Sequence, residues 1–295
     1  MITLKNTVTG ATISLGETPG YEYILEEIDW GQVESERQSY KFIGQTGVIV
    51  TSSTLETRQI SITGWVVSDT AASMTARKRI LNGFFNPLHL IDVITDTGYK
   101  ISGLPTSSIV YPTDTKTNNE ILCKFMVTMF CPDPMFHWEQ ENTVNIANWL
   151  PKFRFPLVIP KDKGIIMGLR SPSLIVNVAN DGHIECGITI VFMARGEVVN
   201  PSLVNVNTQE VLKVNKTLHS GESITVVTTD NNKSVLFTSE GVTQAAFQLL
   251  DFEDSVFLKL RRGDNLMRYN ADDGLDNLDV RIIYSPSYLE VQGVI

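Results

Sequence analysis

Apolar and polar residues alternate over short spans through most of the chain, and glycine, asparagine, aspartate or proline bounds these spans. The segment RQISITGWVV, residues 58–67, shows the pattern clearly, because Ile60 and Ile62 alternate with serine and threonine. Successive side chains of a strand point to opposite faces of its sheet. This period therefore predicts a half-buried β-strand, with Trp65 as a further candidate for the buried face.

The same alternation recurs in both halves of the chain. In KFMVTMF, residues 124–130, Lys124 and Thr128 mark the wetter face. Three similar segments follow in the second half: SLIVNVAN, CGITIVFMA and LDVRIIYS. Many short strands separated by turn residues are typical of β-sandwiches and β-barrels, so we predict a mainly β protein.

One segment, residues 68–87, departs from the alternation. It begins with three residues of types that favour the N-terminus of a helix, Ser68, Asp69 and Thr70. Side chains then recur at three- or four-residue spacing: Met74, Arg77, Ile80 or Leu81, and Phe84. The Asn86-Pro87 pair ends the pattern, because proline has no amide to continue a helix. We predict a single amphipathic helix that lies on the sheet of the first domain.

The stretch CPDPMFHW, residues 131–138, follows a predicted strand and contains two prolines that a central strand would not tolerate. A polar stretch comes next, and then a new series of strands. A chain of 295 residues also exceeds the usual size of a single core. We therefore predict two domains, an N-terminal β domain with one helix at residues 1–136 and a second β domain at residues 137–295.

Composition narrows the function without naming it. Hydrophobic residues make up 42 % of the chain and charged residues 19 %, which is ordinary for a globular protein. The net charge of −9 argues against specific nucleic-acid binding. The N-terminal MITLKNTVTGATISLG lacks the features of a secretory signal, and no apolar stretch is long enough for membrane insertion. Three cysteines make a disulfide framework improbable and favour reduced thiols in a cytosol.

Cys131, His137, His183 and Cys186 have the right number and type for a zinc site. The spacing is poor, because Cys131 and His137 are six residues apart, whereas paired zinc ligands usually lie two to four apart. Cys131 is also an unconvincing nucleophile, since it ends a predicted strand rather than beginning a helix. The sequence favours packed cysteines and surface histidines, and we predict no metal, no cofactor and no catalytic residue.

Three further charged motifs have plainer explanations. The carboxylates of LEEIDWGQVESE, residues 25–36, crowd near a turn, where they are normally solvated, and a pair of catalytic acids is less favoured. In RRGDN, residues 261–265, an Arg-Gly-Asp triplet also suits a hairpin turn, which we prefer. The residues of the basic run Arg77, Lys78 and Arg79 point in different directions around a helix. We therefore favour a solvated face, and a contact to an acidic neighbouring subunit is the second interpretation.

Several longer blocks occur in a characteristic order. The first half has FIGQTGVIVTSSTLETRQISITGWV, then ARKRILNGFFNP and CPDPMF. The second half has ANDGHIECGITIVF, then PSLVNVNTQEVLKVNKTLHSGESITVVTTDNNKSV and FLKLRRGDNLMRYNAD. In this order and spacing the chain resembles the distal tail proteins of long-tailed bacteriophages, especially those that infect Gram-positive hosts. Arg262-Gly263 departs from the Pro-Gly often found in such proteins, which affects one turn.

The resemblance implies an N-terminal β domain that assembles into a hexameric ring, and a C-terminal galectin-like β-sandwich. It implies a structural, non-enzymatic virion protein of the phage tail, assembled in the bacterial cytoplasm. Such a ring caps the tail tube, joins it to the baseplate or tip and leaves a channel for DNA. The implied partners are the tail tube protein, a tail-tip or tail-associated lysin protein, and receptor-binding proteins or host saccharide.

The residues suggest how such a ring is held together. The segment from Gln45 to Ser53 contains TGVIVTSS, whose low charge leaves it free to pair with another strand. We predict that this β-arm reaches the neighbouring subunit. The predicted interface residues are Gln45, Gly47, Val48, Val50, Ser52, Arg77 and Lys78. Six copies at −9 each carry −54, so we expect a neutral or acidic channel through which DNA slides without being held.

The alternative function is a carbohydrate-binding adhesin that acts through the C-terminal sandwich in host recognition. Sugar sites stack the ligand on exposed aromatic side chains beside polar groups. Trp138, Trp149 and Tyr288 are available, but we expect them at domain edges rather than clustered in one set of strands. An enzyme is a third alternative, with no assembled set of residues behind it.

Overall fold

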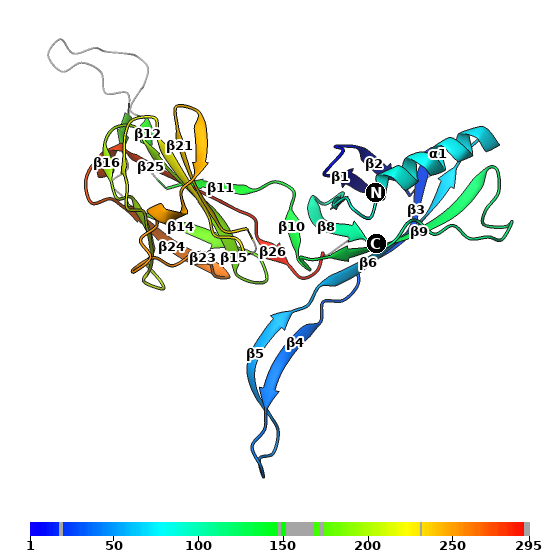
Figure 1. Ribbon diagram of the computed structural model, residues 1–295, viewed down its shortest axis with the longest axis horizontal. Helices are drawn as coiled ribbons and strands as arrows, with labels where there is room; N and C mark the ends of the chain where they lie inside the picture. The colour runs from blue at the N-terminus through cyan, green and yellow to red at the C-terminus, as the bar shows by residue number, and fades with distance from the viewer. Residues whose placement is uncertain (18–19, 147–148, 152–167, 171–173, 231, 292–295) are drawn as a thin grey trace. The chain divides into compact units, whose positions relative to one another are not determined.

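The computed structural model describes residues 1–17, 20–146, 149–151, 168–170, 174–230 and 232–291 (Figure 1). Contacts divide the chain into an N-terminal unit, Met1–Glu139 with Tyr288–Ile295, and a C-terminal unit, Gln140–Ser287. In this division, the last residues of the chain belong to the N-terminal unit. The sequence-based boundaries, 1–136 and 137–295, stay a prediction.

The N-terminal unit is built on one antiparallel sheet with the strand order β2-β1-β7-β8-β9-β6-β3. Its strands are β1 (Ile2–Asn6), β2 (Thr12–Leu15), β3 (Tyr23–Asp29), β6 (Arg58–Val67), β7 (Ile91–Thr95), β8 (Tyr99–Pro105) and β9 (Leu122–Cys131). Two short strands extend it, with β10 (Phe136–Trp138) pairing with both β8 and β26 (Ser287–Tyr288). A separate two-stranded sheet consists of β4 (Ser35–Tyr40) and β5 (Ile49–Leu55).

The two edges of the main sheet meet at a parallel bridge between Gly16 and Ile24. There the amide of Gly16 donates to the carbonyl of Tyr23 at 3.2 Å, and the amide of Leu25 donates to the carbonyl of Gly16 at 2.7 Å. The sheet therefore curls toward a barrel that these two hydrogen bonds close at one point. Closing a sheet in this way reduces the unpaired edge that it offers to solvent.

The predicted alternation is confirmed in β6 and β9, which pair along their full lengths from Arg58↔Cys131 to Val67↔Leu122. Ile60 and Ile62 are fully buried. The prediction for Trp65 was wrong, because this side chain lies on the opposite face, with the Lys124 ammonium 5.5 Å from its ring centroid.

Gly64 explains the error, because it holds the buried position that a larger side chain would be expected to fill. A Cβ at Gly64 would lie 2.5 Å from the carbonyl oxygen of Ile24 and 2.8 Å from the ring of Phe125. The backbone of β3 and an aromatic ring of β9 thus approach the strand where glycine leaves room for them.

Helix α1 (Ala71–Phe84) is the α-helix of the described residues and agrees with the prediction. Its core-facing residues are Met74, Leu81 and Phe84, which settles the choice between Ile80 and Leu81. Ile80 is 58 % exposed. Within the described ranges, no helix combines the length and apolar character that crossing a bilayer requires.

The C-terminal unit contains two larger sheets. One has the order β11-β25-β15-β20-β21-β22, with β23 also on β15, and the other has the order β14-β24-β17-β18. The first comprises β11 (Asn142–Asn145), β15 (Cys186–Ala194), β20 (Ser223–Val227), β21 (Ser234–Ser239), β22 (Val242–Ala245), β23 (Lys259–Leu260) and β25 (Leu278–Tyr284). The second comprises β14 (Ile175–Asn180), β17 (Ser202–Asn205), β18 (Glu210–Lys213) and β24 (Gly263–Asn270).

Shorter elements complete this unit: the strand pairs β12 (Trp149–Pro151) with β13 (Gly168–Arg170) and β16 (Val198–Val199) with β19 (Thr217–Leu218), and the 3-10 turns Phe247–Leu249 and Leu275–Asn277. Both larger sheets contribute to one hydrophobic core, for example through Phe192 of β15 and Tyr269 of β24, which are fully buried. The mainly β class, with one helix on the N-terminal β domain and a C-terminal β-sandwich, is confirmed.

The RRGDN motif, predicted to form a turn, has a bend at Arg262, and its last three residues begin β24. Gly263 adopts a φ of +89° that favours glycine. The expected hairpin is not formed, because β23 pairs with β15 whereas β24 pairs with β14. The side-chain amide of the buried Asn265 donates to the carbonyls of Arg261 at 2.8 Å and Gly263 at 3.0 Å. The motif therefore passes the chain from one sheet to the other.

Two glycine substitutions should change stability in opposite directions. We expect Gly64→Ala to destabilise the N-terminal unit by about 1–3 kcal/mol, because the new methyl group collides with backbone and ring atoms. Gly83→Ala should stabilise it by about 0.5–1 kcal/mol, because Gly83 is helical and a Cβ there meets nothing within 4 Å. Urea unfolding measures both changes, and equal midpoints for the two variants would contradict the packing at Gly64.

Candidate assembly surfaces

A hairpin, which we call the arm, consists of residues 35–55 and projects from the N-terminal unit (Figure 1). Its strands β4 and β5 pair with each other from Ser35↔Leu55 to Tyr40↔Ile49 and form their own two-stranded sheet. Every residue of both strands is exposed. An isolated two-stranded hairpin is marginally stable in water, so an arm of this kind gains stability from a partner.

The arm carries apolar side chains that no core covers. Each of the following is at least 38 % exposed: Tyr40, Phe42, Ile43, Val48, Ile49, Val50 and Leu55. Tyr40 and Phe42 pack edge to face with ring centroids 5.2 Å apart. Such a concentration of exposed apolar residues on one projection is typical of an interaction surface.

Five of the predicted interface residues lie together in the arm: Gln45, Gly47, Val48, Val50 and Ser52. The side-chain oxygen of Gln45 accepts a hydrogen bond from the backbone amide of Phe42 at 3.2 Å, and the backbone amide of Gln45 donates to the carbonyl of Phe42 at 3.1 Å. Gly47 has a φ of +83°, which a tip of this shape needs. Ser52 pairs with Gln38 across the ladder.

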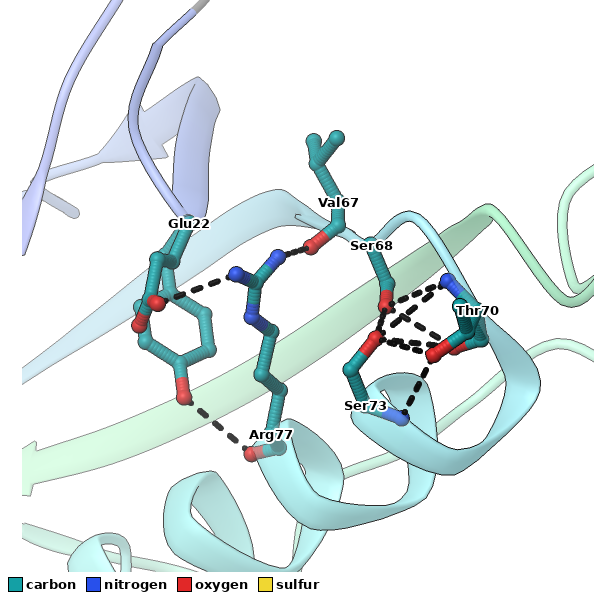
Figure 2. A network of polar contacts seen from close by, with 7 residues as sticks. Glu22, Val67, Ser68, Thr70, Ser73 and Arg77 are labelled. Atoms are coloured by element: carbon teal, nitrogen blue, oxygen red, sulfur yellow. Dashed lines mark hydrogen bonds and ion pairs between the residues drawn. The ribbon is translucent and has the colours of Figure 1, made fainter.

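Arg77 lies on α1, where its cation is bound within its own unit (Figure 2). The guanidinium donates to the carbonyl of Val67 and forms an ion pair with Glu22 at 3.0 Å. In return, the hydroxyl of Tyr23 donates to the carbonyl of Arg77 at 3.1 Å. Arg77 therefore ties the helix to the end of β6 and to the start of β3.

The start of the helix is closed by a capping box, also drawn in Figure 2. The Thr70 hydroxyl accepts from the amide of Ser73 at 3.2 Å, and the Ser73 hydroxyl accepts from the amide of Thr70 at 3.3 Å. The Ser68 hydroxyl donates to the carbonyl of Thr70 at 3.0 Å. The two bonds between Thr70 and Ser73 satisfy amides that the start of a helix leaves unpaired.

The other two members of the basic run differ from each other. The Lys78 ammonium donates to Asn118 at 2.8 Å and lies 5.2 Å from the ring centroid of Tyr111. Arg79 is exposed, which fits the solvated face that the sequence favoured. Arg77 and Lys78, the two cations in the predicted interface set, therefore both have partners inside their own unit.

A groove that the sequence did not predict lies beside the helix. Its volume is about 360 Å³, and it is lined by Thr12, Ile13, Ser14, Gly20, Tyr21, Glu22, Tyr23 and Ile80. We call it the helix-side groove. The sequence offered one signal for an exposed apolar residue here. Ile80 and Leu81 are adjacent on the helix and point in directions about 100° apart, so burying one tends to leave the other outside the core.

Among the candidate metal and thiol residues, both cysteines are buried and His137 lies beside an acidic residue. Burial raises the pKa of Cys131 to about 12 and that of Cys186 to about 12. His137 lies with its Nε2 atom 3.0 Å from the carboxylate of Asp133. Across the described ranges, no group of three or more histidine, cysteine or acidic side chains is arranged to hold a metal ion.

The carboxylates between residues 25 and 36 are exposed: Glu26, Glu27, Asp29, Glu34 and Glu36. Glu26 forms an ion pair with Lys124 at 2.7 Å. Exposed acids of this kind lack the desolvation that a catalytic pair of carboxyl groups depends on.

Two of the aromatic residues considered for sugar binding cluster instead of lying apart. Trp138 stacks on Tyr99 with ring centroids 4.4 Å apart, and its indole Nε1 donates to the hydroxyl of Tyr288 at 3.0 Å. Tyr288 is only 7 % exposed. These rings therefore cover one another within the N-terminal unit. The side chain of Trp149 lies outside the described residues.

Comparison with known families accounts for both units. The model of a phage tail protein RIFT-related domain matches residues 9–131, and that of a siphovirus-type tail component, C-terminal domain, matches residues 181–288. The chain belongs to the siphovirus distal tail proteins. A distal tail protein is a structural component of the phage tail and baseplate. A comparison with curated protein sequences found no match.

Solved structures of phage proteins share the fold. The crystal structure of SPP1 Dit (gp 19.1), described as a paradigm of the hub adsorption apparatus in phages infecting Gram-positive bacteria, matches with a TM-score of 0.67 at 13 % identity. That match covers 98 % of this chain and 100 % of the other. A chain of the phage P2 baseplate in its activated conformation matches with a TM-score of 0.55 at 8 % identity, covering 98 % and 99 % of the two chains.

The three cysteines of this distal tail protein should resist thiol reagents. Cys123, Cys131 and Cys186 are all buried, and for the last two burial also raises the thiol pKa to about 12. We expect no reaction with a disulfide reagent near neutral pH in the folded protein, and reaction of all three thiols in guanidinium. Rapid labelling of any of them in the folded protein would show that the site is open.

Proposed function

We propose that six copies of this protein form a ring at the distal end of the phage tail tube, where the ring joins the tube to the baseplate or tip and leaves a channel for DNA. The observation that carries the proposal is the arm, whose strands are exposed at every residue and carry apolar side chains. A family of tail components provides the setting in which such an arm has a use.

A closed ring requires a heterologous interface, in which one patch of a subunit meets a different patch of the next. The arm supplies a projecting patch of this kind, with Gln45, Gly47, Val48, Val50 and Ser52 in or beside its tip. Arg77 and Lys78 act in this scheme by holding the helix in place, since their cations bind Glu22 and Asn118 of their own unit.

The ring would bind the tail tube protein on one face and a tail-tip or tail-associated lysin protein on the other. Receptor-binding proteins or host saccharide are the partners proposed for the C-terminal sandwich. The protein would assemble in the bacterial cytoplasm and act in the virion without a cofactor or catalytic residue. The adhesin alternative is less well supported, because Trp138 and Tyr288 pack on one another.

Removal of Gly47 to Ser52 should leave a folded monomer. The deletion takes out exposed residues of the arm and none of the buried core of the N-terminal unit. We expect the monomer mass by light scattering and a circular dichroism spectrum and melting temperature close to those of the full chain. A ring of unchanged mass would contradict the role of the arm.

The assembled ring should not bind duplex DNA. Six copies at a formal charge of −9 carry −54. Such a ring offers few unpaired cations that could displace the counterions condensed on DNA into solution, which is the main source of non-specific affinity. We expect no shift in fluorescence anisotropy of a labelled duplex at low salt, where electrostatic binding is strongest. Binding that weakens as salt is added would instead indicate a basic channel.

A further inference from the structure

We propose that the tip of the arm of one copy docks in the helix-side groove of the next copy. The inference rests on the proposed ring and names the surface that receives the arm. The tip contributes Tyr40, Phe42 and Ile43, and the groove contributes Ile13, Tyr21 and Ile80.

The arm cannot fill the groove of its own subunit. Strands β3 and β6 pair from Tyr23↔Val66, beside the groove, to Asp29↔Ser61, from which the chain continues into the arm. At roughly 3.3 Å per residue these six steps separate the groove from the root of the arm by about 20 Å. The ladder of β4 and β5 leads further away from the helix (Figure 1). The tip and the groove therefore lie at opposite ends of the unit.

This separation is the geometry that head-to-tail assembly needs. A projecting patch at one end and a hollow at the other allow each copy to give one contact and receive one. Because the two patches differ, a pair of copies leaves one arm and one groove open, and further copies add until the ring closes.

The groove and the tip each expose apolar side chains, although the groove lining also includes Thr12, Ser14 and Glu22. Ile80 is 58 % exposed and Tyr21 is 39 % exposed, although both belong to a unit with a well-formed core. Ile43 has an exposure of 107 %, so it has no cover from its own chain, and Phe42 is 62 % exposed. The groove has a volume of about 360 Å³ and is open to solvent.

Each of the two surfaces has one charged residue, and the two charges are opposite in sign. Between Tyr40 and Val50 the tip has one charged residue, Lys41, and the groove lining also has one, Glu22. The Glu22 side chain is 60 % exposed even though it pairs with Arg77. Lys41 at the rim of the docked arm would add a second cation beside this carboxylate and would help to fix the register of the contact.

Disulfide cross-linking tests the contact directly. In the chain with Ile43→Cys and Ile80→Cys, we expect oxidation to give a ladder of covalent multimers on a non-reducing gel, up to the size of the ring. The native cysteines are buried and should give little background. The control pairs Ile43→Cys with Val110→Cys, because Val110 is 57 % exposed and adjoins Met126 in another apolar patch of the same unit.

The outcomes separate the docking site from the ring itself. A ladder with the Ile80 variant and none with the Val110 variant supports the groove. An assembled ring that gives no Ile43–Ile80 ladder, or that gives it only with Val110, overturns the groove and leaves the ring intact. A wild-type chain that stays monomeric at every concentration overturns both proposals.

Substitutions provide a second measurement that needs no oxidation. Ile80→Asp places a charge in the groove at an exposed helix position, so the fold should survive while the ring population falls at least tenfold. Leu88→Asp is the matched control, since Leu88 is 85 % exposed in the same unit and lies outside the groove lining. Native mass spectrometry should find full rings for Leu88→Asp, and full rings for Ile80→Asp would contradict the docking site.

Discussion

The ladder of strand β6 is the interaction on which the N-terminal unit depends. It pairs with β9 along its whole length on one side and with β3 on the other. The arm leads into its first residue, Arg58, and its last residue, Val67, accepts a hydrogen bond from Arg77 of the helix. One strand thus fixes the root of the arm at one end and the helix at the other. The separation between the two proposed contact surfaces follows from its length.

Arg58 shows how strongly this strand is held. It is 2 % exposed, and its guanidinium donates to the carbonyl of Leu289 at 2.5 Å and lies 4.7 Å from the ring centroid of Phe136. Burial lowers the pKa of Arg58, although the side chain keeps its charge at any ordinary pH. A buried cation is costly unless partners compensate it. The backbone carbonyl and the aromatic face provide part of that compensation at the root of the arm, while the Nε atom of Arg58 is buried without a hydrogen-bond partner among the described residues.

Local sequence patterns predicted the elements whose period is regular, and failed where a distant segment decides. The alternation of β6 and β9 and the helix from Ala71 were recoverable, because a single buried face imposes each pattern. The face of Trp65 was predicted wrongly because Gly64 takes the buried position. The backbone of β3 lies too close to Gly64 for a side chain there, and the local sequence does not show this contact. The packing of Tyr288 on Trp138 joins residues 150 positions apart, and no local pattern indicates it.

For the candidate surfaces, too, the sequence predicted some features, and others depend on the fold. Low charge around Val48 and Val50 indicated an arm that pairs with another strand, but the exposure of Phe42 and Ile43 depends on how far the hairpin projects. Cysteine and histidine suggested metal chemistry by type alone, whereas burial decides what a thiol does, as for Cys131. Residue type names the chemistry that is available, and packing determines whether it is used.

One arm and one groove at opposite ends of a subunit do not by themselves make a ring. The same contact builds a closed ring or an open filament, depending on the rotation that each docking step introduces. For six copies that rotation must be about 60° with no rise along the axis. The root of the arm is tied to its own unit, because Trp30 packs edge to face on Phe136 with ring centroids 5.3 Å apart and the amide of Glu56 donates to the carbonyl of Glu34 at 2.9 Å. The angle of the contact therefore depends on how the unit holds this root. In the proposed ring, the ladder of β6 would set the direction in which the arm leaves its own subunit.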